Sequence, residues 1–428
     1  MSFDLIVKGG TLPDGTVTDI GIEGDRIAAV EDLGDAEAGE VIDAAGDLVS
    51  PPFVDPHFHM DAVLSYGLPR LNASGTLLEG IALWGELRDI ATVDEMVERA
   101  LRYCDWAVSL GLLAIRTHVD TTPDHLRGLE AMLEVKRIVA PYLDLQIVAF
   151  PQDGLLRTQT GEANLVRALD MGADVVGGIP HFERTMEEGA ESVRRLCRLA
   201  AERGLPVDLH CDETDDPMSR HVETLAREAT RHGLGGRAAG SHLTSMHSMD
   251  NYYVSKLLPL MAEAGLSAIP NPLINIMLQG RHDSFPKRRG LTRVKEMRSL
   301  GIPVGWGQDC VRDPWYSLGT GDMLDVAFMG LHVAQMSSPA EMAACFEMIT
   351  ETNAAIIGLE GYGIAPGRMA SLVVLDATGP TEAVRLRPPR LAVVSKGRVV
   401  SRQPRGDAAL SLPGRPESVR RRHAAGSG

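Results

Sequence analysis

Two histidines separated by a single residue give this sequence its clearest chemical signal. His57 and His59 lie in the segment PHFHMD (56–61), which directly follows an apolar stretch at 48–54. Residues i and i+2 of a β-strand point to the same side, so both imidazoles would face one point. Neutral imidazoles bind zinc and iron(II). The pair indicates a metal site, although an HxH motif alone is a weak signal.

Three further apolar runs end in residues that can bind a metal or move a proton. The runs end at His210, His242 and Asp309, which lie far apart in the chain. In a (β/α)8 barrel the carboxyl ends of the strands form one rim, where active sites lie. We therefore expect these side chains to meet His57 and His59 at the mouth of such a barrel.

A possible proton carrier follows one of these runs. Glu213 comes three residues after His210, so we expect its carboxyl group beside a bound metal rather than on it. A divalent ion lowers the pKa of a bound water to about 7 and supplies hydroxide at neutral pH. A base must still take the water proton and deliver it to the leaving group. Glu213 has a suitable position for this acid–base role.

The middle of the chain alternates short apolar runs with helical patterns, which predicts a parallel sheet. Eight strands over about 250 residues have the size of a TIM-type barrel, so we assign residues 53–363 to an α/β, (β/α)8 barrel. Helices are expected at 93–110, 187–202 and 218–232. The predicted strands end near His59, Asp120, Phe150, Gly178, His210, His242, Asn271 and Asp309.

Both ends of the chain read as short strands and turns. Strands are expected at 3–8, 20–22 and 26–30 near the N-terminus, and at 370–375, 391–394 and 398–400 near the C-terminus. Lys396-Gly397 would form the turn of the last hairpin. Residues 1–52 and 364–405 thus predict one small β-sandwich built from both ends, and 406–428 a mobile tail.

The composition restricts the possible partners and the location. The 428 residues carry a formal net charge of -16, which disfavours a nucleic-acid partner. The five cysteines have no CxxC spacing, so a reducing cytoplasm fits better than a disulfide framework. We find no signal peptide and no apolar stretch long enough for a bilayer. The sequence predicts a cytoplasmic protein without a membrane partner.

The chain resembles the bacterial cytosine deaminases of the amidohydrolase superfamily. The resemblance extends from about residue 45 to about residue 405 and includes motifs with unusual composition. These motifs are PPFVDPHFHMD, SGTLLEGI, LQIVAFPQDG, ADVVGGIPHFE, DLHCDETDD, SHLTSMHS, NPLINIMLQGRHDSFPKRRGLTRVKEM and DPWYSLGTGDML. The resemblance implies a distorted (β/α)8 barrel with a β-sandwich, in agreement with the patterns above.

The resemblance also implies roles for individual residues. One divalent ion, Fe(II) or Zn(II), would be held by His57, His59, His210 and Asp309. Glu213 would shuttle protons, and His242 would orient the hydroxide. The base would be held by Gln152, the backbone of Leu77 and the ring of Trp315. A small nucleobase would be the substrate, and the protein would form homo-oligomers.

The sequence departs from this family directly after Asp309. Family members typically carry His-Asp-Asp where this chain has Gln308-Asp309-Cys310. A thiol behaves as a small hydrophobe, and Cys310 would replace a charge near C5 of the base. We therefore hypothesise that 5-methylcytosine is a good substrate and, in the stronger form of the hypothesis, a better one than cytosine. The alternative is that Cys310 only packs and cytosine stays preferred.

Other functions remain open at this point. Isoguanine, creatinine and aminotriazines share the C–NH2 group beside a ring nitrogen, so a deaminase of such a heterocycle is the main alternative. Binuclear cyclic-amide hydrolases need a carboxylated lysine after strand four, and 174–180 contains no lysine. A non-enzymatic scaffold would have lost metal ligands, which are present here.

Several polar residues have weaker expectations. His118 would support a ligand or Glu213 by a hydrogen bond, or would be an ordinary structural histidine. Asp313 would cap a helix that begins near Trp315. The basic run 287–289 would be solvated. Structural roles are expected for His181, Glu183 and His247.

Overall fold

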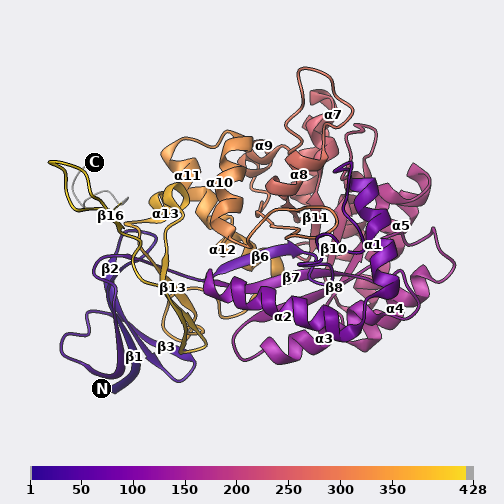
Figure 1. Cartoon of the computed structure of the whole chain (residues 1–428). Helices are drawn as coiled ribbons and strands as arrows, with labels where there is room; N and C mark the ends of the chain where they lie inside the picture. The colour runs from indigo at the N-terminus through magenta and orange to yellow at the C-terminus, as the bar shows by residue number, and fades with distance from the viewer. Residues whose placement is uncertain (1, 421–428) are drawn as a thin grey trace.

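The computed structural model describes residues 2–420. Within this range a seven-stranded parallel sheet curves into the barrel, in the order β12-β11-β10-β9-β8-β7-β6 (Figure 1). Its strands are β6 (Phe53–Phe58), β7 (Leu112–Asp120), β8 (Asp144–Phe150), β9 (Val175–Gly178), β10 (Val207–Cys211), β11 (Ala238–His242) and β12 (Leu266–Ile269). Their carboxyl ends lie within two residues of the positions predicted from the sequence.

The eighth barrel position is not a regular strand. The segment 304–309 closes the barrel through two isolated parallel bridges, Ala268 to Val304 and Phe58 to Asp309. A Cβ atom at Gly307 would lie 2.1 Å from Asn271 Oδ1, so the backbone passes too close to its neighbours for ordinary strand packing. The prediction of eight barrel positions is confirmed, with irregular backbone at the last one.

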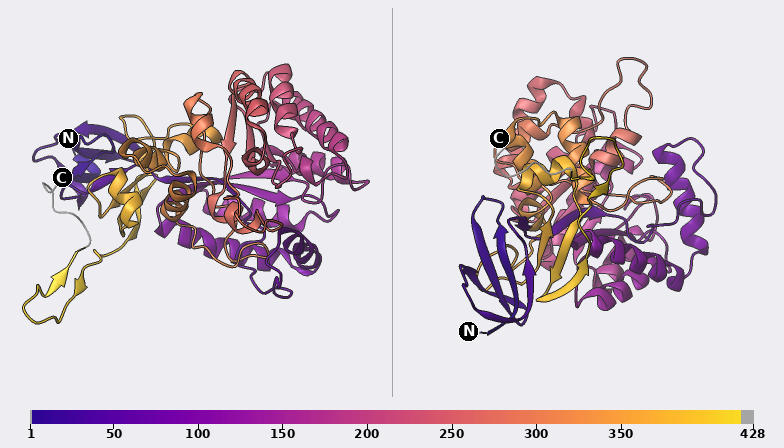
Figure 2. Two further views of the ribbon diagram at one scale, coloured as in Figure 1. Left: turned by 90° about the horizontal axis from the view of Figure 1, so that it is seen from above. Right: turned by 60° about the vertical axis from the view of Figure 1, so that its left-hand side comes forward.

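Helices surround the barrel sheet (Figures 1 and 2). Thr92 and Thr185 start two of them with capping boxes, in which each threonine pairs with the glutamate three residues later. The predicted helices at 93–110, 187–202 and 218–232 correspond to α2, α5 and α6. The helices are α1 (Leu77–Ile90), α2 (Val93–Ser109), α3 (Arg127–Val139), α4 (Gly161–Met171), α5 (Met186–Arg203), α6 (His221–His232), α7 (Asn251–Glu263), α8 (Pro272–Leu278), α9 (Val294–Ser299), α10 (Met323–Ala334), α11 (Pro339–Glu347), α12 (Glu351–Ile357) and α13 (Pro380–Leu386).

A second sheet takes strands from both ends of the chain and lies beside the barrel (Figure 2). Its order is β15-β14-β13-β5-β1-β2-β3, and β4 also pairs with β1. We call it the terminal sheet. Its strands are β1 (Ser2–Thr11), β2 (Val17–Glu23), β3 (Arg26–Glu31), β4 (Glu37–Asp43), β5 (Leu48–Ser50), β13 (Leu372–Leu375), β14 (Arg390–Ser395) and β15 (Arg398–Arg402).

Strand β13 connects the two units because its side chains alternate. Leu372 and Val374 belong to the core of the terminal sheet, whereas Val373 and Leu375 belong to the barrel core. The predicted hairpin between β14 and β15 is present. Gly397 in its turn has φ +79° and lies so close to the backbone of Gly24 that a side chain would collide with it.

The remaining expectations about the chain concern its tail, its cysteines and membranes. Residues 406–420 contain a short pair, β16 (Ala408–Ala409) with β17 (Ser418–Val419), and the rest of the predicted mobile tail lies outside the described residues. Every cysteine of the described range is buried and free of disulfides. No helix in residues 2–420 is both long and apolar enough to span a bilayer.

Candidate metal centre and substrate pocket

Four side chains converge at the carboxyl ends of two barrel strands and the closing segment. His57 and His59 come from β6 and its end, His210 from β10 and Asp309 from the segment after β12. His59 Nε2 lies 3.0 Å from His210 Nε2 and 3.5 Å from Asp309 Oδ1. His57 Nε2 lies 3.7 Å from the same Asp309 oxygen. The sequence-predicted ligands therefore meet at one point.

This arrangement fits a divalent metal ion. Ligand bonds of about 2.0–2.2 Å in a tetrahedral site place donor atoms roughly 3.3–3.6 Å apart, close to the spacing here. All four side chains are buried, and His57 Nε2 has no hydrogen-bond partner among the described residues. Buried polar atoms are normally paired, and an imidazole nitrogen that has no hydrogen-bond partner and faces a carboxylate fits the coordination of a cation between them.

The electrostatics keep the imidazoles neutral. Burial and the neighbouring histidines hold the pKa of His57 and His210 well below the usual value, and burial lowers that of His59 to about 4. Burial raises the pKa of Asp309 well above its usual value. Neutral imidazoles offer lone pairs to a metal, and a buried carboxylate gains most from a nearby positive charge.

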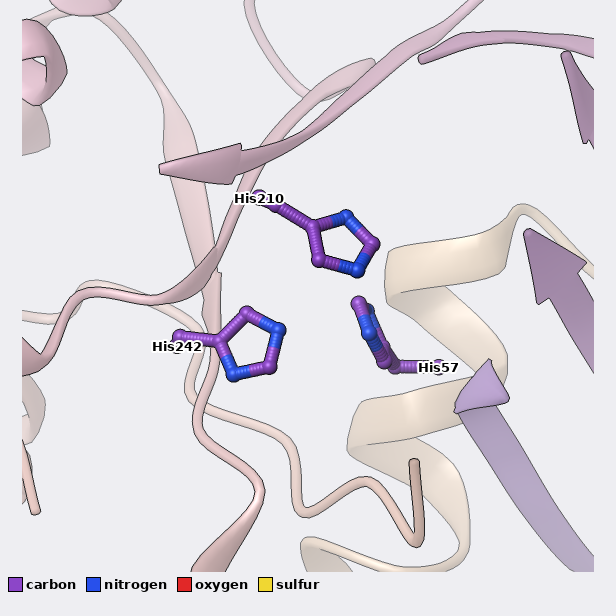
Figure 3. A group of neighbouring side chains, drawn as sticks. All are labelled: His57, His210 and His242. Atoms are coloured by element: carbon purple, nitrogen blue, oxygen red, sulfur yellow. The ribbon is translucent and has the colours of Figure 1, made fainter. Parts of the chain in front are cut away.

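His242 lies directly against this group, as Figure 3 shows for the rings of His57, His210 and His242. Its backbone is left-handed, with φ +68°, which turns the side chain at the end of β11. Its Nδ1 accepts from the side-chain amide of Asn275 at 3.0 Å, because Asn275 Oδ1 already accepts the Asn271 N–H. Its proton therefore resides on Nε2.

Glu213 also lies beside His242, with its Oε1 at 3.5 Å from Nδ1 of the imidazole. Burial raises the pKa of Glu213 to about 8, so this carboxyl group holds a proton near neutral pH in the metal-free protein. The preceding Asp212 has φ +55° and accepts hydrogen bonds from the Ser219 hydroxyl and the His221 N–H. These bonds fix the turn that carries Glu213.

A pocket opens directly above these groups. It contains every predicted substrate-binding residue, together with aliphatic side chains that the sequence did not reveal. The aliphatic members are Ile81, Ile179, Ile274 and Leu278. The predicted members are Leu77, Gln152, Cys310 and Trp315, and they line it with His59, His210, Glu213, His242 and Asp309. The pocket thus combines apolar walls with a few polar groups, as small-molecule sites do.

Trp315 packs its ring against α1. A Cβ atom at Gly80 would lie 2.4 Å from Trp315 Cδ1, so only glycine permits this contact. Asp313 Oδ1 accepts from the backbone N–H groups of Trp315 and Tyr316, both at 2.9 Å. The predicted helix near Trp315 is wrong, because residues 311–320 form an irregular turn. Asp313 stabilises that turn instead of a helix.

A partly buried ion-pair network holds the loop that carries Gln152. Arg88 contacts Asp120 and Asp153, each at 2.6 Å, and Trp84 donates to Asp120 at 2.8 Å. Asp153 follows Gln152 directly, so α1 and β7 together fix the position of the Gln152 loop. Leu77 lies in the first turn of α1, where backbone N–H groups have no partner within the helix.

Cys310 contributes a neutral thiol to the pocket. Its Sγ lies 3.4 Å from Asp309 Oδ1, and burial raises its pKa well above the usual value. A protonated thiol at this position is apolar and uncharged, unlike a carboxylate.

Comparison with known proteins identifies the family. The protein-family model described as "Amidohydrolase family" matches residues 40–401, far more than half of the chain. The chain belongs to the amidohydrolase family. This amidohydrolase is similar to 5-methylcytosine deaminase from Klebsiella pneumoniae, solved with 5-fluorocytosine, at 41% identity and TM-score 0.92. That match covers 96% of this chain and 100% of the other.

Other relatives of the amidohydrolase act on related heterocycles. It is 30% identical over 410 residues to N-isopropylammelide isopropyl amidohydrolase of Pseudomonas sp. (strain ADP), covering 93% of this chain and 97% of the relative. It is 29% identical over 368 residues to pterin deaminase of Rhizobium rhizogenes, and the match covers 84% of this chain and 82% of the relative. The predicted resemblance is confirmed, and the protein is a metal-dependent hydrolase of C–N bonds in heterocycles.

Two weaker expectations differ from the structure. His118 is buried beside His57, with ring centroids 4.1 Å apart, but neither ring nitrogen has a hydrogen-bond partner in the described chain. It therefore supports neither a ligand nor Glu213 by a hydrogen bond. The basic run 287–289 is not simply solvated, because Arg288 pairs with Asp283 at 2.6 Å and donates to the Asp215 carbonyl at 2.9 Å.

The other polar residues organise the rim. His181 Nδ1 contacts the His210 carbonyl at 3.0 Å, and Glu183 accepts from the Leu155 N–H at 2.7 Å. His247 ends the short 3-10 helix after β11. These contacts agree with the structural roles expected for them.

Proposed function

We propose that this amidohydrolase hydrolytically deaminates a free cytosine-type base and that it prefers 5-methylcytosine to cytosine. The observation that carries the proposal is the position of Cys310, which lines the pocket beside Asp309. The chain that carries it is 41% identical to a 5-methylcytosine deaminase over nearly its whole length. The reaction converts 5-methylcytosine and water into thymine and ammonia.

His57, His59, His210 and Asp309 would hold one divalent ion, Fe(II) or Zn(II). Their imidazole and carboxylate donors suit either ion. When bound, the ion supplies a nucleophile near neutral pH because it acidifies water. The two ions are distinguished by metal analysis of the purified protein.

Glu213 would move the protons. Its carboxylate would take a proton from water and deliver it to ring nitrogen N3. It would then take the remaining proton of the oxygen added at C4, assisted by Asp309 and His242, and pass it to the amine, so that the C4–N bond breaks and ammonia leaves. The proton on Nε2 of His242 would donate a hydrogen bond to the attacking oxygen, while Asn275 holds the ring. Burial raises the pKa of Glu213, and a cation bound beside it would lower that pKa again, so its carboxylate could accept the first proton and its acid form could release it.

The pocket walls would select the base. Gln152 would hydrogen bond the amide edge of the pyrimidine, and the backbone N–H of Leu77 would donate to the same edge. Trp315 would cover one face of the ring. The thiol of Cys310 would contact the 5-methyl group, and a fitting methyl pocket is worth roughly 1–3 kcal/mol of discrimination.

A second candidate is hydrolysis of an aminotriazine. It is favoured by the 30% identity to an N-isopropylammelide hydrolase over most of both chains. Deamination of isoguanine or creatinine is a further alternative, because these compounds share the C–NH2 group beside a ring nitrogen. A homo-oligomeric state and a cytoplasmic location stay predictions from the resemblance and the composition.

The test is a panel of kcat/KM values for ammonia release by protein reconstituted with Fe(II) or Zn(II). The panel holds 5-methylcytosine, cytosine, isoguanine, creatinine and an N-alkylated aminotriazine. The proposal predicts the highest value for 5-methylcytosine, about 10-fold or more above cytosine. A higher value for cytosine would refute the C5 preference, and a higher value for the triazine would favour the second candidate.

A further inference from the structure

A line of buried polar groups runs beneath the metal centre. Arg116 on β7 pairs with Asp208 Oδ2 on β10 at 3.1 Å. Ser241 on β11 donates its hydroxyl proton to Asp208 Oδ1 at 2.8 Å. The same hydroxyl oxygen lies 2.9 Å from Nδ1 of His57 on β6. All four side chains are at most 2% exposed.

The strand pairing explains why these groups meet. Ser241 is paired with His210 in the β10–β11 register. Asp208 precedes His210 by two residues, so its side chain points to the same side of β10, one layer deeper in the barrel. Arg116 and His118 are related in the same way on β7. The barrel therefore holds an ion pair directly below the layer of imidazoles.

The direction of the hydrogen bonds fixes the state of His57. A serine hydroxyl has one proton, and here that proton is donated to the carboxylate of Asp208. Its oxygen can then only accept from His57, so Nδ1 of His57 carries the proton. The lone pair of His57 is left on Nε2, the atom that faces Asp309.

We propose that Asp208 and Ser241 are positioning residues that hold His57 in its Nδ1–H form and direct Nε2 at the metal. The proposal rests on the proposed function, in which His57 is a metal ligand. Groups that hydrogen bond the second nitrogen of a ligating histidine set its tautomer and orientation, and their loss typically costs about 10–100-fold in metal affinity.

The same residues do not form a second metal site. Donor atoms of His57, His118 and Asp208 lie within 4.8 Å of one another, a spacing that a metal ion could bridge. However, both oxygens of Asp208 are occupied by Arg116 and Ser241, and the guanidinium would repel a cation. We therefore expect one metal ion per chain.

The test compares two serine-to-alanine variants. Ser241→Ala removes the hydroxyl beside His57 but leaves the Arg116–Asp208 pair. Ser192→Ala is the matched control, because Ser192 is equally buried and donates to the Gly189 carbonyl at 2.9 Å, far from the metal, on α5. Metal-free proteins are titrated with Zn(II) against a competing chelator, and thermal unfolding of each metal-free variant reports on folding.

The expected result is about 10–100-fold weaker zinc binding for Ser241→Ala and an unchanged value for Ser192→Ala. Ser241→Thr, which keeps the hydroxyl, should recover at least part of the lost affinity. An affinity of Ser241→Ala within about twofold of the wild type would overturn the proposal. If the wild type itself binds no metal, the proposed function fails before this inference is reached.

A second measurement does not depend on the folding of Ser241→Ala. Histidine-selective ¹⁵N NMR of the metal-free wild type distinguishes the two tautomers of His57, which is assigned by its loss in His57→Gln. The proposal predicts a proton on Nδ1 of His57. A proton on Nε2 would overturn the proposal even if Ser241→Ala did not fold.

Discussion

The terminal sheet and the rim of the barrel are built on opposite principles. The main hydrophobic cluster of the terminal sheet is aliphatic, with Leu5, Ile22 and Leu372 among its members. At the rim, His210, Asp309 and other titratable groups are almost completely buried. Apolar burial stabilises the first region, whereas burial of charged or polar groups costs free energy unless a partner compensates it.

The backbone shows the same contrast. In the terminal sheet, left-handed backbone occurs in turns that solvent can reach, as at Ala45, Lys396 and Gly397. At the rim, His242 and Asp309 adopt left-handed backbone although both are buried. Strain and buried polarity coincide where the chemistry is proposed. The comparison teaches that strained backbone and buried polar groups are concentrated at the rim, whereas apolar burial dominates in the terminal sheet.

The largest effect should follow removal of a proposed ligand. Asp309→Ala should lower kcat/KM for 5-methylcytosine by roughly 10⁴-fold or more and abolish stoichiometric metal binding. The metal-free protein should unfold at the same or a higher temperature, because a buried carboxyl group has been removed. Kinetics, metal analysis and calorimetry check the three parts. Retained metal would show that Asp309 is not a ligand.

Glu213→Gln should separate proton transfer from metal binding. The amide cannot carry the proton between water, N3 and the amine, so kcat should fall by roughly 10²–10⁴-fold. Metal content should stay at the wild-type level, since Glu213 is not among the proposed ligands. A variant that loses its metal as well would place Glu213 on the metal rather than beside it.

Cys310→Asp should change the substrate preference rather than the overall rate. The added charge would disfavour a methyl group at C5, so the ratio of kcat/KM for 5-methylcytosine over cytosine should fall by about 10–100-fold. Cys345→Ala is a control, because Cys345 is buried near Met336, outside the pocket. An unchanged ratio in Cys310→Asp would show that other residues set the preference.

Leu372→Ala, in the terminal sheet, should lower stability without lowering activity, unlike the substitutions at the rim. Loss of this buried side chain should destabilise the protein by about 2–5 kcal/mol. The kcat of the folded, metal-loaded enzyme should stay within about twofold, because the residue contacts no group of the site. Urea unfolding and kinetics at low temperature measure the two quantities. A large loss of kcat would mean that the two regions are coupled.

A smaller effect is expected in the pH dependence of stability. Burial raises the pKa of Glu213 to about 8. Its favourable contribution is complete below the unfolded pKa of about 4.3 and is lost as pH rises through the folded pKa. Between about pH 6 and pH 8, metal-free wild type should therefore lose roughly 2–5 °C in Tm relative to Glu213→Gln. A constant difference in Tm would contradict this.

The strand ends could be predicted because the sequence marks them clearly. His210 and His242 each end a short apolar run, and parallel strands bring such ends to one rim. The hairpin of the terminal sheet could be predicted equally well, because Lys396-Gly397 separates two apolar runs in the sequence. The eighth barrel position was harder, because 302–309 reads as a strand although its glycines force an irregular path.

The supporting residues could not be found in the same way. Asp208 lies inside an apolar run and pairs with Arg116, which is 92 positions away. Its spacing of two from His210 was the available signal, because it predicts the same side of the strand. The contact of Asn275 with His242 depends on how α8 packs over the rim, and the irregular turn at Trp315 depends on Gly80. These pairings require the folded structure.

The most direct test of the account is the fate of oxygen and nitrogen in a single substrate. Metal-reconstituted protein is incubated with 5-methylcytosine in H₂¹⁸O, and the products are measured by mass spectrometry and ammonia assay. The account predicts thymine that carries one ¹⁸O atom, with one ammonia released per thymine formed. Metal-loaded, folded protein that yields neither thymine nor ammonia would contradict it.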